Sequence, residues 1–240
     1  MLKLLWAQSL TEVYYGRLQR AREFSRQAVD AAKRNNNNEL AALIELDLGD
    51  EDADFGNSVQ ARQAAAAALA LAPGRDVQVQ AALVLAKVND AAQAQKLADR
   101  LSKEHPLDTL IQGCWLPTIR AEIELSHGNA GKAIEFLERA KPYELGVSLY
   151  PTYVRGLTYL RSGQGSAAAT EFQKILDHRG LMVNSQLVPL GRLGLARARA
   201  MKRDTSGARA AYQDFLALWK DADPDIPILK ETKAEYAKLQ

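Results

Sequence analysis

The chain has 240 residues, of which 47% are hydrophobic and 7% aromatic, and its 31 Lys and Arg against 29 Asp and Glu give a formal net charge of +2. Such balanced, mixed charge argues against a strongly basic nucleic-acid module. The single cysteine, Cys114, excludes an internal disulfide framework, and no run reaches the roughly 18 apolar residues of a membrane span.

The predicted helices recur along the chain as six similar units. Each unit has an alanine followed by apolar or small residues four and seven positions later, a spacing that places all three on one helix face. The leading alanines are Ala21, Ala61, Ala94, Ala133, Ala168 and Ala208. Five residues earlier stand Gly16, Gly56, Asn89, Gly128, Gly163 and Arg203. Gly or Asn before a polar residue is typical of one helix ending and the next beginning.

Each unit is therefore predicted to be a helix, a tight turn, a second helix and a linker. The units are expected at about residues 2–36, 40–74, 75–108, 114–147, 149–183 and 189–222. A last helix is expected over residues 226–240, with its apolar residues facing the preceding pair as a cap. The apolar start from Leu2 to Trp6 indicates either a fragment of a larger protein or a helix that packs on something upstream.

These repeats resemble the tetratricopeptide repeat (TPR) family, which pairs antiparallel helices in units of about 34 residues. The fifth unit carries the resemblance best, with Tyr153, Gly156, Tyr159, Gly163, Ala168, Phe172 and Ile175. The resemblance implies an all-α fold: a single right-handed superhelical solenoid of about six TPR-like antiparallel helix pairs plus a C-terminal capping helix. It also implies ligands along the concave face formed by the first helix of each pair.

Several stretches also look similar to the C-terminal TPR region of bacterial, notably acidobacterial, eukaryote-like serine/threonine kinases. They are Tyr14–Leu18, Phe55–Asn57, Pro73–Asp76, Tyr212–Leu216 and Trp219–Pro224. This resemblance implies part of a modular bacterial signalling protein, with a cytoplasmic location favoured over an extracytoplasmic one. It does not imply kinase activity, because the chain has no Gly-rich phosphate loop and no V-A-I-K, H-R-D or D-F-G string.

The residues that could carry chemistry favour structural interpretations. The acidic stretch Asp50–Asp54 fails the calcium-loop template, because the glycine and the bidentate acid are out of place. Cys114 has His105 and His127 on different predicted elements and no supporting motif. The arginine series Arg17–Arg26 is expected to face solvent. The sequence therefore predicts a protein that is not an enzyme and has no metal or cofactor.

Helical counting back from each leading alanine selects the residues expected on the concave face. The predicted partner-binding residues are Asp76, Lys87, Trp115, Glu122, Tyr150, Tyr153, Arg161 and Arg197. Aromatic and basic residues together favour a peptide with apolar anchors and some acidic character, and two guanidiniums beside two rings could bind a carboxylate. The alternative is that many of these side chains pack between helices.

Six repeats without a catalytic set predict a non-catalytic module that binds a peptide or protein segment in its concave groove. Nucleic-acid partners and membrane insertion are not expected. The alternative function is a scaffold or self-association domain, a homodimer that brings together an attached kinase or DNA-binding domain. The apolar start of the chain favours this alternative.

Overall fold

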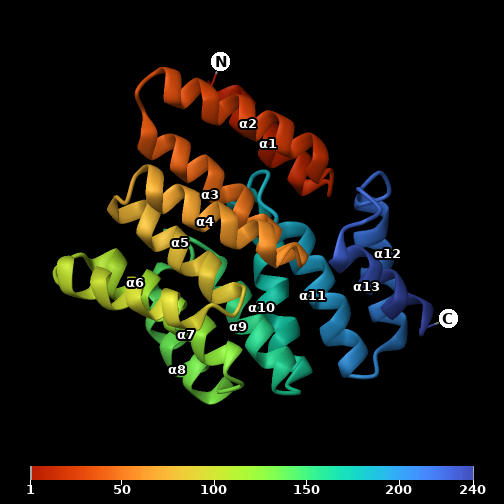
Figure 1. Cartoon of the computed structure of the whole chain (residues 1–240). Helices are drawn as coiled ribbons and strands as arrows, with labels where there is room; N and C mark the ends of the chain where they lie inside the picture. Colours follow the sequence, from red (N-terminus) through yellow and green to blue (C-terminus); the bar gives the residue numbers. More distant parts are fainter. Residues whose placement is uncertain (1, 240) are drawn as a thin grey trace.

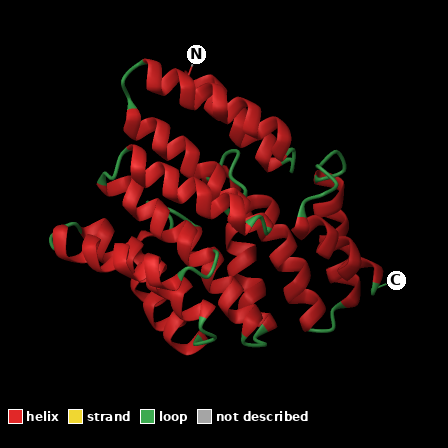
Figure 2. Ribbon diagram, viewed as in Figure 1, coloured by secondary structure: helices red, strands yellow, loops and turns green. Residues whose placement is uncertain are grey.

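The computed structural model describes residues 2–239, in which the regular elements are all helices, joined by turns and loops, with no strand (Figures 1 and 2). Six antiparallel pairs follow one another: α1 (Leu2–Tyr14) with α2 (Leu18–Arg34), α3 (Asn38–Phe55) with α4 (Ser58–Leu71), α5 (Arg75–Lys87) with α6 (Ala91–Glu104), α7 (Leu116–Ser126) with α8 (Ala130–Ala140), α9 (Tyr150–Arg161) with α10 (Gly165–Asp177), and α11 (Leu187–Met201) with α12 (Thr205–Leu218). The predicted all-α solenoid of six helix pairs and a last helix is confirmed.

The remaining elements lie in the linkers or after the last pair. A π-helical turn, η1 (Ile111–Trp115), leads into α7, and two 3₁₀ turns, η2 (Lys141–Tyr143) and η3 (Arg179–Leu181), precede α9 and α11. The last helix is α13 (Pro227–Ala237), while Gln240 of the expected cap lies outside the described residues. Within residues 2–239, no helix combines the length and the hydropathy needed to cross a bilayer.

The six predicted turn residues all adopt the left-handed conformation. Their φ angles lie between +60° and +94°, at Gly16, Gly56, Asn89, Gly128, Gly163 and Arg203. At each turn the next amide donates to a carbonyl five residues earlier, as from Arg17 N to Glu12 O at 2.9 Å and from Asp204 N to Arg199 O at 3.0 Å. This hydrogen bond closes the first helix, so one local rule sets every turn within a pair.

The predicted alanine triplets are the places where the helices cross. No member of the six triplets is more than 3% exposed, including Ser25, whose side chain lies among apolar neighbours in the first pair. Small side chains let the helix axes approach closely, and the first helices are covered by neighbours on both sides along the array. The second helices bury a single stripe, as in α6, where only Ala94, Ala98 and Leu101 are buried.

Phe172 of α10 shows how tightly the fifth and sixth pairs pack. Its ring, fully buried, lies between Gly156 of α9 and Gly194 of α11. A Cβ atom added at Gly194 would lie 2.5 Å from the ring, and one added at Gly156 would lie 2.8 Å from it. The two glycines therefore provide the space that this aromatic residue occupies.

The last pair returns to the first, so the array is closed on itself (Figure 1). Trp219 Nε1 donates to Tyr14 O at 3.0 Å, and Asp223 N donates to Gly16 O at 3.0 Å. The Trp219 ring also packs edge-to-face on Phe55, with the two centroids 5.0 Å apart. The α13 helix contacts α12, as expected, and it contacts α3 as well.

The apolar start of the chain packs partly on its own neighbouring helices. Leu2, Leu5 and Trp6 pack on α2 and α3, and Trp6 Nε1 donates to Asp47 Oδ2 at 2.8 Å. Leu4 is the exception, at 62% exposed. The observation that favoured self-association is therefore accounted for in part by packing inside the chain.

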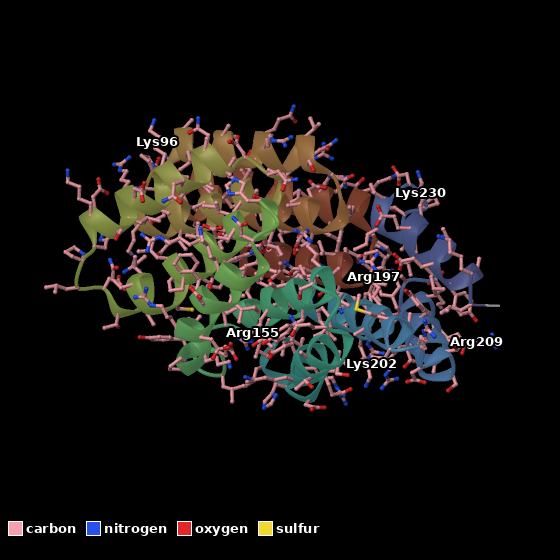
Figure 3. All side chains as sticks on the ribbon, turned by 90° about the horizontal axis from the view of Figure 1, so that it is seen from below. Lys96, Arg155, Arg197, Lys202, Arg209 and Lys230 are labelled. Carbon is pink, nitrogen blue, oxygen red and sulfur yellow. The ribbon has the colours of Figure 1, made fainter. Side chains whose placement is uncertain are left out.

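A buried ion cluster joins α9, α10 and the linker before α9. Arg155 is 1% exposed and pairs with Glu144 at 2.7 Å and with Glu171 at 2.8 Å, while Lys174 pairs with Glu144 at 2.6 Å. Burial alone would raise the pKa of Glu144, but hydrogen bonds from Arg155 and Lys174 hold it below its usual range. Figure 3 shows Arg155 within the body of the array, whereas Lys96 and Arg209 lie toward its edges.

Candidate binding site

Four acidic residues lie along one face of α3. Asp47, Asp50, Glu51 and Asp54 are spaced by three, four and seven residues, which places them in one row. This row faces α5, whose Lys87 pairs with Asp50 and Asp54, and the linker between α10 and α11, whose Gln186 bonds to Asp50; α9 lies beyond Lys87. We call the surface formed by these elements and α7 the inner face.

A polar network crosses the inner face from helix to helix. Lys87 of α5 places Nζ 2.8 Å from Asp50 Oδ1 and 2.9 Å from Asp54 Oδ2. The same nitrogen lies 4.4 Å from the centroid of the Tyr150 ring on α9. The Tyr150 hydroxyl donates in turn to Glu122 Oε1 of α7 at 2.5 Å. Although burial would lower the pKa of Lys87, the two aspartates keep it above its usual value, so this lysine is charged.

A cleft of about 330 Å³ opens beside this network. Its walls are mainly apolar, and two carboxylates, Asp50 and Asp76, lie among them. The apolar lining side chains include Leu43, Val79, Leu83, Trp115, Met182 and Leu187. Pockets that bind ligands commonly combine a large apolar wall with a few polar groups in this way.

A smaller cavity of about 210 Å³ lies next to the cleft. Asp47, Asp50 and Glu51 line one side of it, and the linker residues 183–186 line the other. Asp50, Ser185 and Gln186 border both spaces. The two cavities are thus neighbours, separated by the contact between Gln186 and Asp50.

The linker over residues 178–186 crosses the inner face instead of staying at the rim, and Figure 1 shows it beside α3. Gln186 Nε2 donates to Asp50 Oδ2 at 3.1 Å, and Asn184 Nδ2 donates to Thr11 Oγ1 at 2.9 Å. These bonds span 136 and 173 residues of sequence. The chain's own linker therefore covers part of the acidic row.

Glu51 is the least compensated member of the row. It is 2% exposed, and within the described part of the chain its carboxylate receives no hydrogen bond and no ion pair. Burial, followed by the charges of Asp47 and Asp50, raises the pKa of Glu51 well above its ordinary value of 4.5. Burial likewise raises the pKa of Asp47 to about 6 and that of Asp54 to about 7. The inner face therefore holds more acid than cation.

Glu51→Gln should stabilise the protein, and more so as the pH rises. The folded state holds an extra proton between the unfolded pKa near 4.5 and the raised folded-state pKa, so stability falls as pH rises through that window. Glutamine does not titrate, so the variant does not lose this stability as the pH rises. At pH 8 we expect a gain of about 1–3 kcal/mol, or roughly 2–12 °C in melting temperature, and near pH 4.5 almost none.

Thermal unfolding followed by circular dichroism at several pH values measures this difference. Glu45→Gln is the matched control, because Glu45 lies on the same helix but lines an open hollow beside α2 and α4. The control should leave the melting temperature within about 2 °C at every pH. A Glu51→Gln protein that melts below wild type at pH 8 would contradict the interpretation of Glu51 as an uncompensated acid.

The structure gathers most of the residues that the sequence selected. Asp76, Trp115 and Tyr150 line the cleft, and Lys87 and Glu122 form the network beside it. Tyr153, also selected, is buried between the rings of Tyr150 and Phe172, whose centroids lie 6.3 Å and 6.0 Å from its own. Tyr153 thus packs between helices, the alternative kept open for these side chains.

The two arginines are placed differently from the pocket that was expected. Arg197 pairs with Glu235 at 3.0 Å and with Glu231 at 3.7 Å, so α13 supplies its carboxylates and it is not free for a ligand (Figure 3). Arg161 is exposed at the end of α9, where Nη1 donates to Leu125 O at 3.3 Å. The expected pair of free guanidiniums beside the two tyrosines is therefore not formed.

Sequence reasoning missed the acidic row and the linker that crosses it. The row was within reach, because counting back 18, 11 and 7 residues from Ala61 gives Leu43, Asp50 and Asp54. The residues predicted for the concave face nevertheless begin at Asp76, and Asp50–Asp54 is compared only with a calcium loop. The position of Gln186 had no such signal, because no local pattern indicates that a linker folds inward.

The other reactive side chains do not assemble into a centre within residues 2–239. Cys114 is buried, and burial together with the charge of Glu144 raises its pKa to about 11, which keeps it a thiol. No three His, Cys, Asp or Glu side chains of this range are grouped so as to hold a metal ion.

No family model matches the chain, and no curated protein matches it in sequence. Solved structures do match: the crystal structure of the yeast Tom70 superposes with a TM-score of 0.53 at 16% identity. The match covers 90% of this chain and 43% of the Tom70 chain, so this chain spans less than half the length of that protein. At this identity the likeness shows the fold alone, a TPR-like helical repeat.

Proposed function

We propose that the chain is a non-catalytic interaction module that binds an extended segment of a partner protein along its inner face. The observation that carries the proposal is the cleft between α3, α5 and the linker 178–186, with its apolar walls and its two carboxylates. A TPR-like fold supports protein partners in general, and this cleft is where the described residues offer apolar anchoring next to polar groups.

The proposal also includes a place in a bacterial signalling protein. The resemblance of Tyr14–Leu18 and Trp219–Pro224 to the TPR region of bacterial kinases supports this context. The alternative, a self-association domain, has weaker support, because Leu2, Leu5 and Trp6 are partly buried against α2 and α3. Light scattering over a range of concentrations separates the two, since a self-association domain would gain mass as concentration rises.

Binding can be tested by selecting peptides from a random dodecapeptide display library on the immobilised chain. Selected peptides are then synthesised with a fluorescent label, and their affinities are measured by anisotropy. Val79→Trp should weaken binding by about tenfold or more, because Val79 lines the cleft and an indole there would fill it. Trp115→Ala, which removes a wall of the same cleft, should weaken it as well.

Gln63→Trp is the control of matched size, because Gln63 is exposed on α4 and lines a hollow on the opposite side. It should leave every affinity within about twofold of wild type. The proposal fails if no peptide is selected, or if Val79→Trp binds as tightly as Gln63→Trp while both remain folded by circular dichroism.

A further inference from the structure

We propose that the cleft is a pocket for a lysine or arginine side chain of the bound segment, whose cationic head pairs with Asp50 in place of the Gln186 amide. This inference rests on the proposed function and specifies its partner: a segment with a basic anchor. It replaces the partially acidic segment that the sequence suggested.

The inner face carries more acidic than basic side chains. Four carboxylates lie in the row on α3, and one cation, Lys87, contacts two of them. Asp47 accepts from Trp6 and Gln80, which are both neutral. Glu51 has neither a hydrogen bond nor an ion pair among the described residues. The row therefore holds more acidic side chains than Lys87 compensates, and a second cation would favour their ionised form in a place where water screens little.

The two carboxylate oxygens of Asp50 have different partners, one charged and one neutral. Its Oδ1 atom pairs with Lys87, whereas its Oδ2 atom accepts from the Gln186 amide at 3.1 Å, and both Asp50 and Gln186 line the two cavities. A hydrogen bond from a charged donor is shorter and about twice as strong as one from a neutral amide. An ammonium or guanidinium group can therefore replace Gln186 with a net gain, whereas a neutral or acidic group cannot.

The cleft has the shape and the lining to hold a long side chain with a charged end. Leu43, Val79 and Leu83 provide an apolar wall that leads toward Asp50, and Asp76 stands exposed among the lining residues. Lysine and arginine bury their methylene stems against such walls while the charged head reaches a polar group. The volume of about 330 Å³ is large enough for one long side chain.

Glu51 adds an observation that is independent of the cleft. An acidic side chain that is 98% buried without an ion pair is costly, and Glu51 lines the smaller cavity together with Asp50 and Gln186. When Gln186 moves aside, the two cavities join, because Asp50, Ser185 and Gln186 border both. The head group at Asp50 then lies next to Glu51 and Asp47.

The probes are the dodecapeptides obtained by display selection and their variants in which each Lys or Arg is replaced by Gln. Selected sequences should share a basic residue, and its replacement should weaken binding to the wild-type chain by about tenfold or more. Affinity should also fall as the salt concentration rises, because the interaction is between charges.

Two matched pairs of protein variants locate the effect. Asp50→Asn and Asp54→Asn each remove one carboxylate from Lys87, but only Asp50 borders the cleft, so only Asp50→Asn should cost about tenfold in affinity. Asp76→Asn and Asp108→Asn each remove a carboxylate from Arg75, and only Asp76 lines the cleft. Asp76→Asn should cost about threefold and Asp108→Asn nothing measurable.

Gln186→Ala keeps the test decisive if Asp50→Asn does not fold. Without the competing amide, the basic peptides should bind about two- to fivefold tighter, and their Gln variants should be unaffected. Peptides that bind in the cleft without a basic residue, or that lose equal affinity with Asp50→Asn and Asp54→Asn, would overturn this inference and leave the proposed function intact. If no peptide is selected at all, the proposed function falls first, and this inference with it.

Discussion

Arg155→Met should lower the free energy of unfolding by about 3–5 kcal/mol, because it removes the cation of a buried cluster and leaves its anions in place. Arg155 and Glu144 are each 1% exposed. Arg155 pairs with two carboxylates, those of Glu144 and Glu171. In the variant, Lys174 alone faces Glu144, and Glu171 loses its partner. In melting temperature the loss corresponds to roughly 6–20 °C.

The effect should also depend on pH in a definite direction. Hydrogen bonds from Arg155 and Lys174 overcome burial and hold the pKa of Glu144 below 4.5, so the stabilisation is present above that value and is lost as pH falls through the folded-state pKa. The difference in stability between the variant and the wild type should therefore shrink as the pH falls below 4.5. Urea unfolding at pH 7 and at pH 3.5 measures both quantities.

Arg161→Met, on the same helix but exposed, is the control and should change stability by less than about 0.5 kcal/mol. Adding Glu144→Gln and Glu171→Gln to Arg155→Met should recover most of the loss, because the uncompensated charges are then gone. Equal stabilities of Arg155→Met and Arg161→Met would show that the cluster contributes nothing.

Phe172→Ala should cost about 3–5 kcal/mol, because a fully buried ring is lost from a position where the backbone cannot close the gap. The ring holds α9 and α11 apart at Gly156 and Gly194. Thermal and urea unfolding of the folded variant measure the loss. A cost below about 1 kcal/mol would mean that α9 and α11 move toward α10 and fill the space that the ring leaves.

The pairing of the ring with the glycines gives this experiment its own control. Gly194→Ala alone should destabilise by about 1–3 kcal/mol, since its Cβ would lie 2.5 Å from the ring. In the Phe172→Ala background the same change should be neutral or stabilising, because the space is free and alanine favours a helix. Additive effects of the two substitutions would contradict the direct contact.

Local rules explain why so much of the fold could be predicted from the sequence. A left-handed turn residue and an alanine crossing are set within about a dozen residues of one another, so each of the six units carries its own signal. Even Arg203, an unusual residue for this conformation, takes φ +60° because the units around it require the same turn. Position in the repeat outweighed the preference of one side chain.

The binding site was harder, because its residues meet only in the folded chain. Lys87, Glu122 and Tyr150 were selected by position, and they do lie together on the inner face. Arg197 was selected by the same count, but Glu235 reaches it from α13, 38 residues away. The charge of a groove depends on which side chains neutralise one another, and spacing along one helix does not contain that information.

The bond between Trp219 and Tyr14 changes how the protein must come apart. An open row of repeats can fray from either end, one unit at a time, since each unit depends only on its neighbours. Here the turn after α1 is bonded to the end of α12, so we expect fraying of the first pair to be coupled to fraying of the last. Losing the first pair also exposes the Trp219 and Phe55 rings. We therefore expect the repeats to unfold more cooperatively than those of an open row.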